Sequence, residues 1–313
     1  MSELSPLFDE SFLHKIDRLS LVVRRRRAGQ IKGERRSTKR GSSVEFADYR
    51  VYSKGDDLRR VDWNIYARLE RPFVKLFEEE EDLTVHLLLD ASRSMDWPGG
   101  GEGAAGPTNK WLYARRTAAA LGYIALSSGD RVTVGLLKGG EGGAAGPTLP
   151  QTDRFGPARG KGQSLRLLQF LSERDAAGRT DLDRALHEYA FAAHRPGLAF
   201  VITDLFSPSG YQDGLSTLLA RGYEVMLLHV LAPEEAEPRL AGDLKLVDVE
   251  SGREQEVSID AGMRTLYRRR LAAWQDETNR WCGQRGVSYV PVVTNTPFDA
   301  LILFHLRRRG LVR

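Results

Sequence analysis

The chain has 313 residues, of which 41% are hydrophobic and 28% are charged, and its formal net charge is +4. These fractions are typical of a soluble globular protein, and the length suffices for one large domain or two modest ones. No stretch approaches the roughly 20 apolar residues that span a bilayer, and the N-terminus lacks the basic start and apolar core of a signal peptide. A single cysteine, Cys282, excludes an internal disulfide and a thiolate metal cage. We therefore expect a cytoplasmic protein.

The positive charge is concentrated near the N-terminus. Residues 1–75 hold 18 Lys and Arg against 11 Asp and Glu, so the remainder carries a net charge of −3. The basic runs at 24–27 and 33–40 suit a nucleic acid or an acidic partner. No nucleic-acid-binding module is recognisable around them, so we favour a solvated basic segment that the acidic run at 78–82 partly neutralises. Steeply salt-dependent affinity for DNA or RNA would contradict this interpretation.

The first predicted elements lie within residues 1–81, which we interpret as an N-terminal extension. Apolar residues at helical spacing predict a helix over 8–23. The segment that follows mixes aromatic and charged residues around a turn at Lys54–Asp56, and FVKLFEEE at 73–80 predicts a strand. We expect the aromatic residues of this segment to form a small core packed on the larger domain.

From residue 82 to 313 strands alternate with helices, which predicts an α/β domain with a doubly wound, mainly parallel sheet flanked by helices. Strands are predicted at 83–90, 130–139, 197–204, 223–231 and 287–294, and helices at 109–129, 163–174, 181–194, 209–221, 261–283 and 298–309. A hairpin at about 243–260, turning at Ser251–Gly252, is inserted late in this pattern.

Two glycine-rich motifs resemble nucleotide-binding loops. GEGAAG at 101–106 has the GxGxxG spacing, but it does not sit in the tight turn after a strand. GPARGKG at 156–162 is one residue short of a phosphate-binding loop and has Gly162 where a Ser or Thr would bind magnesium. We interpret both as loop expansions and expect no nucleotide site.

Carboxylates and hydroxyls follow the predicted strands at one edge of the sheet. Asp90 ends the first strand, with Ser92 and Ser94 in the next turn, and Asp204 ends LAFVITD. Thr180 stands in a turn before a helix. Ligands of doubly wound sheets bind at the carboxyl ends of strands, and these are the hard oxygen ligands that Mg²⁺ prefers. An ion held by few carboxylates keeps residual positive charge and attracts a carboxylate from another protein.

Other interpretations of these residues are weaker. Asp90 alone suits a helix cap. A serine hydrolase requires GxSxG and a histidine partner, and a phosphoaspartate enzyme would usually have a second carboxylate where Ser92 stands. His187 and His194 lie about 10 Å apart on a helix, too far for one small ion, and His86 lies inside a strand, where we expect it in the core.

DASRS resembles the DxSxS motif of the von Willebrand factor A-like fold, with GRT and VITD following in the expected order over roughly residues 82–310. This resemblance implies a metal-ion-dependent adhesion site that takes ligands from three loops: Asp90, Ser92 and Ser94, then Thr180, then Asp204. Mg²⁺ is the expected ion, with Mn²⁺ and Ca²⁺ as alternatives. Arg179 stands where glycine is common, which would alter access to the ion.

The segment from Gly41 to Glu80 and the later LVDVESGREQEV resemble the bacterial domain-of-unknown-function 58 family. That resemblance implies a cytosolic, non-enzymatic protein that is often encoded beside a MoxR-type AAA+ ATPase and acts with it as an adaptor in chaperone-like assembly of protein complexes, with no client implied.

Two functions stay open. The first is a non-enzymatic, metal-dependent protein-binding module whose ion accepts an Asp or Glu from a protein partner. The alternative is a metal-dependent hydrolase, a phosphatase or esterase that uses Asp90 or a metal-bound water, although the sequence offers it no convincing general base.

Overall fold

The protein is represented by a computed structural model that describes residues 16, 19–21, 44–79, 83–98, 108–138, 153–179, 181–193, 195–250 and 252–307. The chain divides into two compact units. One comprises Met1–Arg26 and Leu83–Arg313, and the other comprises Arg27–Asp82.

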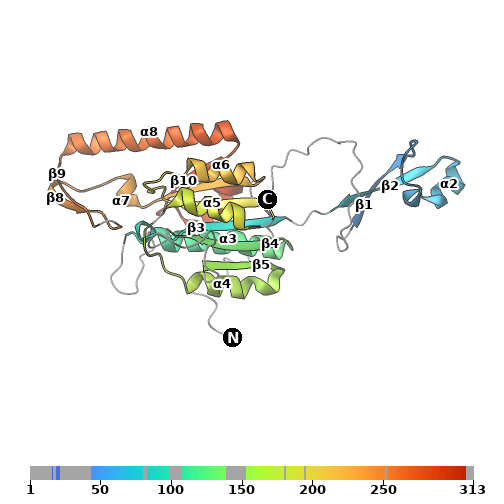
Figure 1. The fold of residues 1–313 in the computed structure, drawn as a ribbon, viewed down its shortest axis with the longest axis horizontal. Helices are drawn as coiled ribbons and strands as arrows, with labels where there is room; N and C mark the ends of the chain where they lie inside the picture. The colour runs from blue at the N-terminus through green and yellow to red at the C-terminus, as the bar shows by residue number, and fades with distance from the viewer. Residues whose placement is uncertain are drawn as a thin grey trace. The chain divides into compact units, whose positions relative to one another are not determined.

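A mostly parallel sheet forms the centre of the larger unit (Figure 1), as the sequence predicted. In the described part of the chain it has six strands in the order β10-β7-β6-β3-β4-β5, and only β5 runs antiparallel to its neighbour. The strands are β3 (Thr84–Asp90), β4 (Arg131–Leu137), β5 (Arg154–Arg159), β6 (Leu198–Thr203), β7 (Glu224–Leu231) and β10 (Ser288–Val293).

Helices cover both faces of the sheet, with α5, α6 and α8 on one side and α3 and α4 on the other (Figure 1). Their bounds are α3 (Lys110–Ser127), α4 (Ser164–Ser172), α5 (Leu182–Ala192), α6 (Gln212–Ala220), α7 (Pro233–Ala236), α8 (Ala261–Arg285) and α9 (Phe298–Ala300), with the short helices η2 (Arg93–Met95), η4 (Lys161–Gln163) and η5 (Leu301–Leu306). The predicted helix over 298–309 is therefore α9 followed by the π-helical turns of η5. No helix among the described residues is both long and apolar enough to cross a membrane.

The continuous apolar run of β3 arises because both of its faces are covered. Leu87 and Leu89 belong to the core beneath α3 and α4, whereas Leu88 belongs to the core beneath α5 and α6. A strand between two helical layers cannot alternate apolar and polar residues without burying a polar side chain.

The second glycine-rich motif is not the loop that we expected. Arg154–Arg159 form the edge strand β5, which pairs with β4, and Lys161–Gln163 form η4. Gly156 has φ +86°, and a Cβ there would lie 2.3 Å from the Val132 carbonyl oxygen. This close approach of the two backbones requires glycine. Because glycine and proline are typical of loops, the sequence pattern does not predict a strand here. The GEGAAG motif lies outside the described residues.

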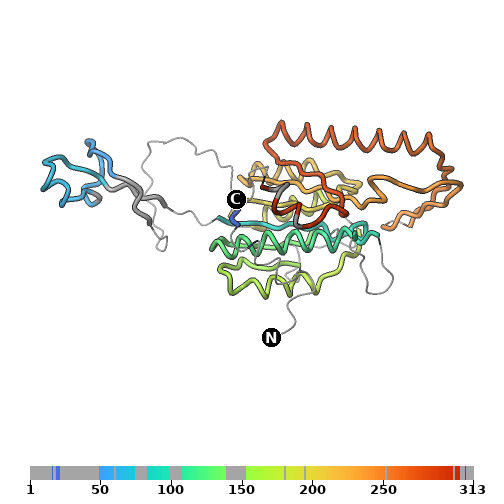
Figure 2. Tube along the Cα trace, turned by 180° about the vertical axis from the view of Figure 1, so that it is seen from behind, coloured from blue at the N-terminus to red at the C-terminus, as the bar shows by residue number. Residues whose placement is uncertain are grey.

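The inserted hairpin is confirmed. It consists of β8 (Gly242–Val247) and β9 (Glu254–Ile259), paired antiparallel, and it continues directly into α8, whose N-cap is Asp260. Figures 1 and 2 show it beyond the carboxyl ends of the parallel strands, at the end of the unit where α8 begins.

The smaller unit is a two-stranded sheet with short helices. It comprises β1 (Val44–Val51), η1 (Leu58–Arg60), α2 (Trp63–Leu69) and β2 (Phe73–Glu79). The predicted strand and the turn after Ser53 are confirmed, whereas three of the aromatic side chains expected in a core are exposed within this unit. Trp63 is 61% exposed, Tyr66 is 44% exposed and Tyr49 is 37% exposed. Asp62 caps α2 through the Asn64 and Ile65 amides, so local hydrogen bonds rather than aromatic burial organise this segment.

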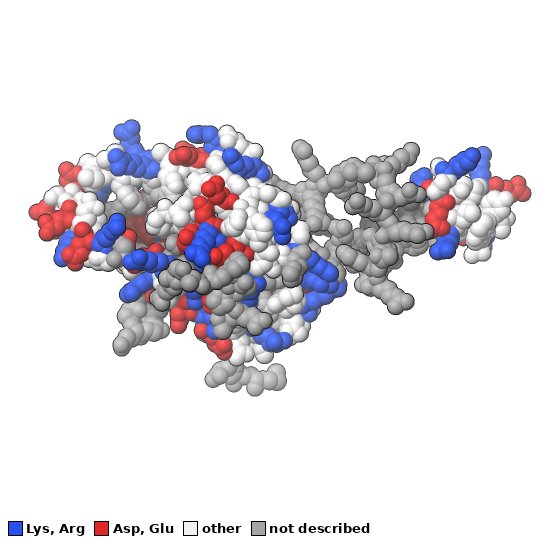
Figure 3. Space-filling view, in the orientation of Figure 1, with Lys and Arg blue, Asp and Glu red and all other residues white. Residues whose placement is uncertain are grey.

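The basic runs at 24–27 and 33–40, and nearly all of the predicted helix at 8–23, lie outside the described residues. On the face of the larger unit drawn in Figure 3, Lys and Arg are interspersed with Asp and Glu.

Candidate functional site

The sheet topology places Asp90 beside Asp204. Strands β3 and β6 are parallel neighbours in which Leu89 pairs with Ile202. The chain leaves β3 for β4 on one side and leaves β6 for β7 on the other. The gap between β3 and β6 is therefore the switch point of the sheet, where ligands of such folds bind.

Asp90 is a fully buried carboxylate held by hydrogen bonds. The Thr203 hydroxyl donates to Oδ2 at 2.7 Å, and the Ser92 amide donates to Oδ1 at 3.1 Å. The Ser92 hydroxyl also hydrogen-bonds the carboxylate. Burial first, and the nearby Asp204 second, raise the pKa of Asp90 to about 6 against the opposing effect of these hydrogen bonds. The site therefore disfavours the bare carboxylate charge.

The two serines lie with Asp90 in one turn. The Oγ atoms of Ser92 and Ser94 are 2.9 Å apart. Ser92 occupies the N-cap position of η2 but makes no side-chain capping hydrogen bond, so helix capping does not account for it. The structure thus brings Asp90, Ser92 and Ser94 together in one turn, beside the strand that precedes Asp204.

Asp204 is also fully buried, and it has a cationic partner. Lys110 Nζ donates to Asp204 Oδ2 at 2.8 Å and to Glu235 Oε1 at 2.5 Å. The Phe206 amide donates to Asp204 Oδ1 at 3.0 Å. Burial lowers the pKa of Lys110, but attraction to Asp204 and Glu235 outweighs it, and the net pKa is raised. Lys110 is therefore a buried ammonium group at the rim of the predicted site.

Sequence reasoning missed Lys110 and Glu235, although signals for both existed. Lys110 is the first residue of α3, after the N-cap Asn109, where the helix dipole disfavours positive charge. Glu235 follows the carboxyl end of β7, at the same sheet edge as Asp90 and Asp204. A lysine at a helix N-terminus and a third carboxylate after a parallel strand both indicate this edge of the sheet.

The second predicted loop lies against the first. The Arg93 amide donates to the Gly178 carbonyl at 3.0 Å, and the Ala177 amide donates to the Ala91 carbonyl at 2.8 Å. Thr180, the predicted ligand from this loop, lies outside the described residues. Its neighbour Arg179 donates from Nε to the Glu250 carbonyl in the β8–β9 turn at 3.1 Å.

The charges at this edge fit a divalent cation. When ionised, Asp90, Asp204 and Glu235 carry three negative charges against the single positive charge of Lys110. Asp90 has no ion-pair partner among the residues that the structure describes. Buried charge of one sign is costly unless a counter-ion neutralises it. The hydroxyls of Ser92 and Ser94 add neutral oxygen donors of the kind that Mg²⁺ accepts.

Among the described residues, no group of three or more His, Cys, Asp or Glu side chains could hold a metal ion, so a cation at this edge would depend on hydroxyl ligands as well as on carboxylates. His86 is buried in β3 with Nδ1 2.7 Å from the Tyr189 hydroxyl, which confirms its place in the core. His187 is exposed beside Thr217, and His194 lies outside the described residues. His229 is fully buried and makes the same kind of contact with Tyr289.

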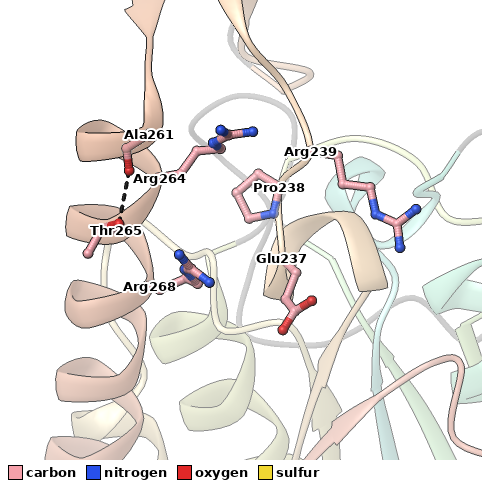
Figure 4. Close-up of a pocket in the computed structure, with 7 residues that line it drawn as sticks. All are labelled: Glu237, Pro238, Arg239, Ala261, Arg264, Thr265 and Arg268. Atoms are coloured by element: carbon pink, nitrogen blue, oxygen red, sulfur yellow. Dashed lines mark hydrogen bonds between the residues drawn. The ribbon is translucent and has the colours of Figure 1, made fainter.

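A pocket of about 270 Å³ lies elsewhere, between α8 and the segment after α7 (Figure 4). Arg239, Arg264 and Arg268 contribute three positive charges to its wall, and Glu237 contributes one negative charge. The net charge of this pocket is positive, so it repels metal ions, and it shares no residue with the Asp90 edge.

Residues 48–277 match the family described as "Protein of unknown function DUF58". The chain belongs to this family. It is 30% identical over 295 residues to the uncharacterized protein Rv1480 of Mycobacterium tuberculosis, covering 93% of this chain and 88% of that protein. It is 31% identical over 148 residues to the uncharacterized protein MAV169 of Mycobacterium avium, covering 47% of this chain and 87% of that protein.

Two solved structures resemble parts of this DUF58 protein. One is the conserved hypothetical protein BatB from Bacteroides thetaiotaomicron, with a TM-score of 0.37 and 14% identity over 67% of this chain and 90% of that chain. The other is an aerotolerance-related membrane protein from Bacteroides fragilis, with a TM-score of 0.41 and 16% identity over 70% of this chain and 96% of that chain. Both TM-scores are below 0.5, so neither likeness establishes a shared fold.

Proposed function

We propose that this protein is a non-enzymatic, metal-dependent protein-binding module. The observation that carries the proposal is the fully buried Asp90, whose carboxylate is repelled by the nearby Asp204 and has no cation of its own among the described residues. Asp90, Ser92 and Ser94 would hold the ion, with Thr180 and Asp204 from the other two loops. Mg²⁺ is the proposed ion, and Mn²⁺ or Ca²⁺ would use the same oxygen donors.

The loop order supports a von Willebrand factor A-like interpretation of the fold. The first loop follows β3, the second precedes α5 and the third follows β6. The first two loops are joined by backbone hydrogen bonds, and the first and third meet where Thr203 donates to Asp90. Such a rim would present one face of a bound ion to a partner.

Lys110 defines the role of Asp204 in this proposal. Because Asp204 Oδ2 already accepts from Lys110 and Oδ1 accepts from the Phe206 amide, Asp204 would act mainly through its charge. The direct ligands would then be few, and a bound Mg²⁺ would supply a Lewis-acidic position for an Asp or Glu of a protein partner. The partner that we propose is a client or component of a MoxR-type AAA+ ATPase system, for which this protein acts as an adaptor in assembly.

A metal-dependent hydrolase remains the competing function, because the same acidic edge can bind a water-activating ion. Its difficulty is the general base. Burial lowers the pKa of His229, near Asp204, to about 4, and its Nδ1 is engaged by Tyr289. A phosphatase and esterase screen with Mg²⁺ distinguishes the two functions, since turnover that Asp90→Asn abolishes would overturn our proposal.

Isothermal titration calorimetry with Mn²⁺ and Mg²⁺ tests the site itself. The wild-type protein should take up one ion, Asp90→Asn should weaken affinity at least tenfold, and Ser92→Ala should weaken it less because water can replace a hydroxyl. Asp153→Asn is the matched control, since Asp153 forms a partly exposed ion pair with Lys138. Absence of ion uptake, or a partner pull-down that survives both chelation and Asp90→Asn, would contradict the proposal.

A further inference from the structure

The β8–β9 hairpin lacks a core of its own. Both strands are largely exposed, and Leu246, Val247 and Val249 are 42%, 58% and 46% exposed. An isolated two-stranded hairpin is marginally stable in water. Contacts at its two ends must therefore decide where it lies, and one end is fixed by its continuation into α8.

The other end is its turn, and there Glu250 contacts both loops of the candidate metal site. The Ser94 amide donates to Glu250 Oε1 at 3.4 Å, and Arg179 Nε donates to the Glu250 carbonyl at 3.1 Å. Ser94 belongs to the first site loop and Arg179 is adjacent to Thr180 in the second. A single residue of the hairpin thus presents a carboxylate and a carbonyl to the rim of the site.

The turn holds Glu250 in this position through local hydrogen bonds. The Glu250 amide donates to Asp248 Oδ1 at 3.1 Å, and the Gly252 amide donates to the Asp248 carbonyl at 2.9 Å. Gly252 has φ +70°, which favours glycine. The hydrogen bonds of Asp248 therefore hold Glu250 where its carboxylate meets the Ser94 loop.

We propose that Glu250 is an internal occupant of the candidate site, standing where a partner's Asp or Glu would bind, and that the hairpin must lift before a partner can enter. This inference rests on the proposed function. It also specifies the ligand class: an acidic residue in a polypeptide turn, recognised through its carboxylate at the Ser94 loop and through its own carbonyl by Arg179.

The tether gives this internal occupant an advantage over a partner. A carboxylate on a short connection has an effective concentration in the millimolar range at its site. A partner must displace Glu250. The partner's apparent affinity is therefore its intrinsic affinity multiplied by the fraction of molecules in which the site is open. Removing the Glu250 carboxylate should therefore strengthen the capture of an acidic turn in trans, whereas removing Arg179 should weaken it.

The contact is tested without any metal by hydrogen–deuterium exchange of the full-length protein. Glu250→Ala should speed exchange of the turn amides at 248–253, and the matched control Glu256→Ala, on an exposed residue of the same hairpin, should not. Equal exchange in the two variants would overturn the inference.

Occupancy is tested by fluorescence anisotropy with a labelled peptide of residues 244–257 as the probe, in Mg²⁺ and in EDTA. Glu250→Ala should bind the peptide at least fivefold more tightly than the wild-type protein in Mg²⁺, and Glu250→Ala combined with Arg179→Ala should lose that gain. If the wild-type and Glu250→Ala proteins bind the peptide with equal affinity, although the wild-type protein takes up Mn²⁺ in calorimetry, this inference alone is overturned. Lack of ion uptake by both proteins would overturn the proposed function and this inference with it.

Discussion

Lys110 and Asp204 form an ion pair in which Nζ lies 2.8 Å from Oδ2 and both side chains are fully buried. The same ammonium contacts Glu235, whose side chain is 17% exposed. Desolvating these groups is costly, and it is offset only while attraction and hydrogen bonds between them persist. Lys110 thus neutralises part of the negative charge at this sheet edge. Asp90 has no cationic partner among the residues that the structure describes.

Replacing Lys110 by Met should destabilise the protein by about 3–5 kcal/mol, because Asp204 and Glu235 would stay buried without their cation. The matched control is Lys138→Met, which removes a partly exposed pair to Asp153 at 3.4 Å and should cost less than about 1 kcal/mol. Urea unfolding in EDTA measures both free energies of unfolding. Similar losses in the two variants would show that the buried pair does not stabilise the fold.

Asp90 should make the metal-free protein less stable as the pH rises. Its folded-state pKa is raised from 3.8 to about 6, so the folded state holds a proton that the unfolded state has released between these values. The free energy of unfolding therefore falls through this window, by about 3 kcal/mol. Asp90→Asn lacks this titration, so the difference between the two proteins reports the Asp90 carboxyl together with its interaction with Asp204.

Urea unfolding of wild type and Asp90→Asn in EDTA at pH 4 and pH 7 checks this expectation. The wild-type protein should lose about 2.4 kcal/mol relative to the variant between the two pH values, because the carboxyl of the unfolded state is already partly ionised at pH 4. A constant difference would mean that Asp90 titrates normally and that the edge does not disfavour its charge.

Much of the larger unit could be predicted because its determinants are local. The apolar run before Asp90 predicts a doubly covered strand, and VITD before Leu205 predicts a second strand that ends at the same sheet edge. Strand β5 was not predicted because Gly156 and Pro157 are residue types typical of loops. Gly156 is needed in the strand because the backbone of β4 lies too close to allow a Cβ atom.

The contacts that complete the candidate site could not be predicted from local sequence patterns, because they join residues far apart in the chain. Lys110 meets Asp204 across 94 residues, and Ser94 meets Glu250 across 156 residues. Such pairs depend on how α3 and the hairpin lie over the finished sheet, which neither periodicity nor motif spacing specifies. In the smaller unit, α2 is short and its aromatic residues Trp63 and Tyr66 are exposed, so aromatic content alone does not place these two side chains in a core of the unit.

Two buried histidines should make the protein sensitive to acid. Burial lowers the pKa values of His86 and His229 from 6.5 to about 4, so the unfolded state binds protons that the folded state excludes. Their contribution to stability is complete above pH 6.5 and declines towards pH 4, by about 3 kcal/mol for each residue. His86→Gln should flatten this decline by about one proton in urea titrations. An unchanged slope in His86→Gln would contradict the prediction.

Gly197 should tolerate no side chain, because it fixes the approach of β6 to β3. A Cβ there would lie 2.0 Å from the Thr84 carbonyl oxygen, and the Gly197 carbonyl accepts the Glu224 amide at 3.0 Å on its other side. The backbone cannot retreat without breaking one of these contacts, so Gly197→Ala should cost about 3 kcal/mol or more. Gly162→Ala, with nothing within 4 Å of its added Cβ, should change stability by less than about 1 kcal/mol.

Because the β3–β6 register sets Asp90 beside Asp204, Gly197→Ala should also weaken Mn²⁺ uptake in calorimetry under conditions where the variant stays folded. Wild-type stability and uptake in this variant would show that the two strands can shift without disturbing the candidate site.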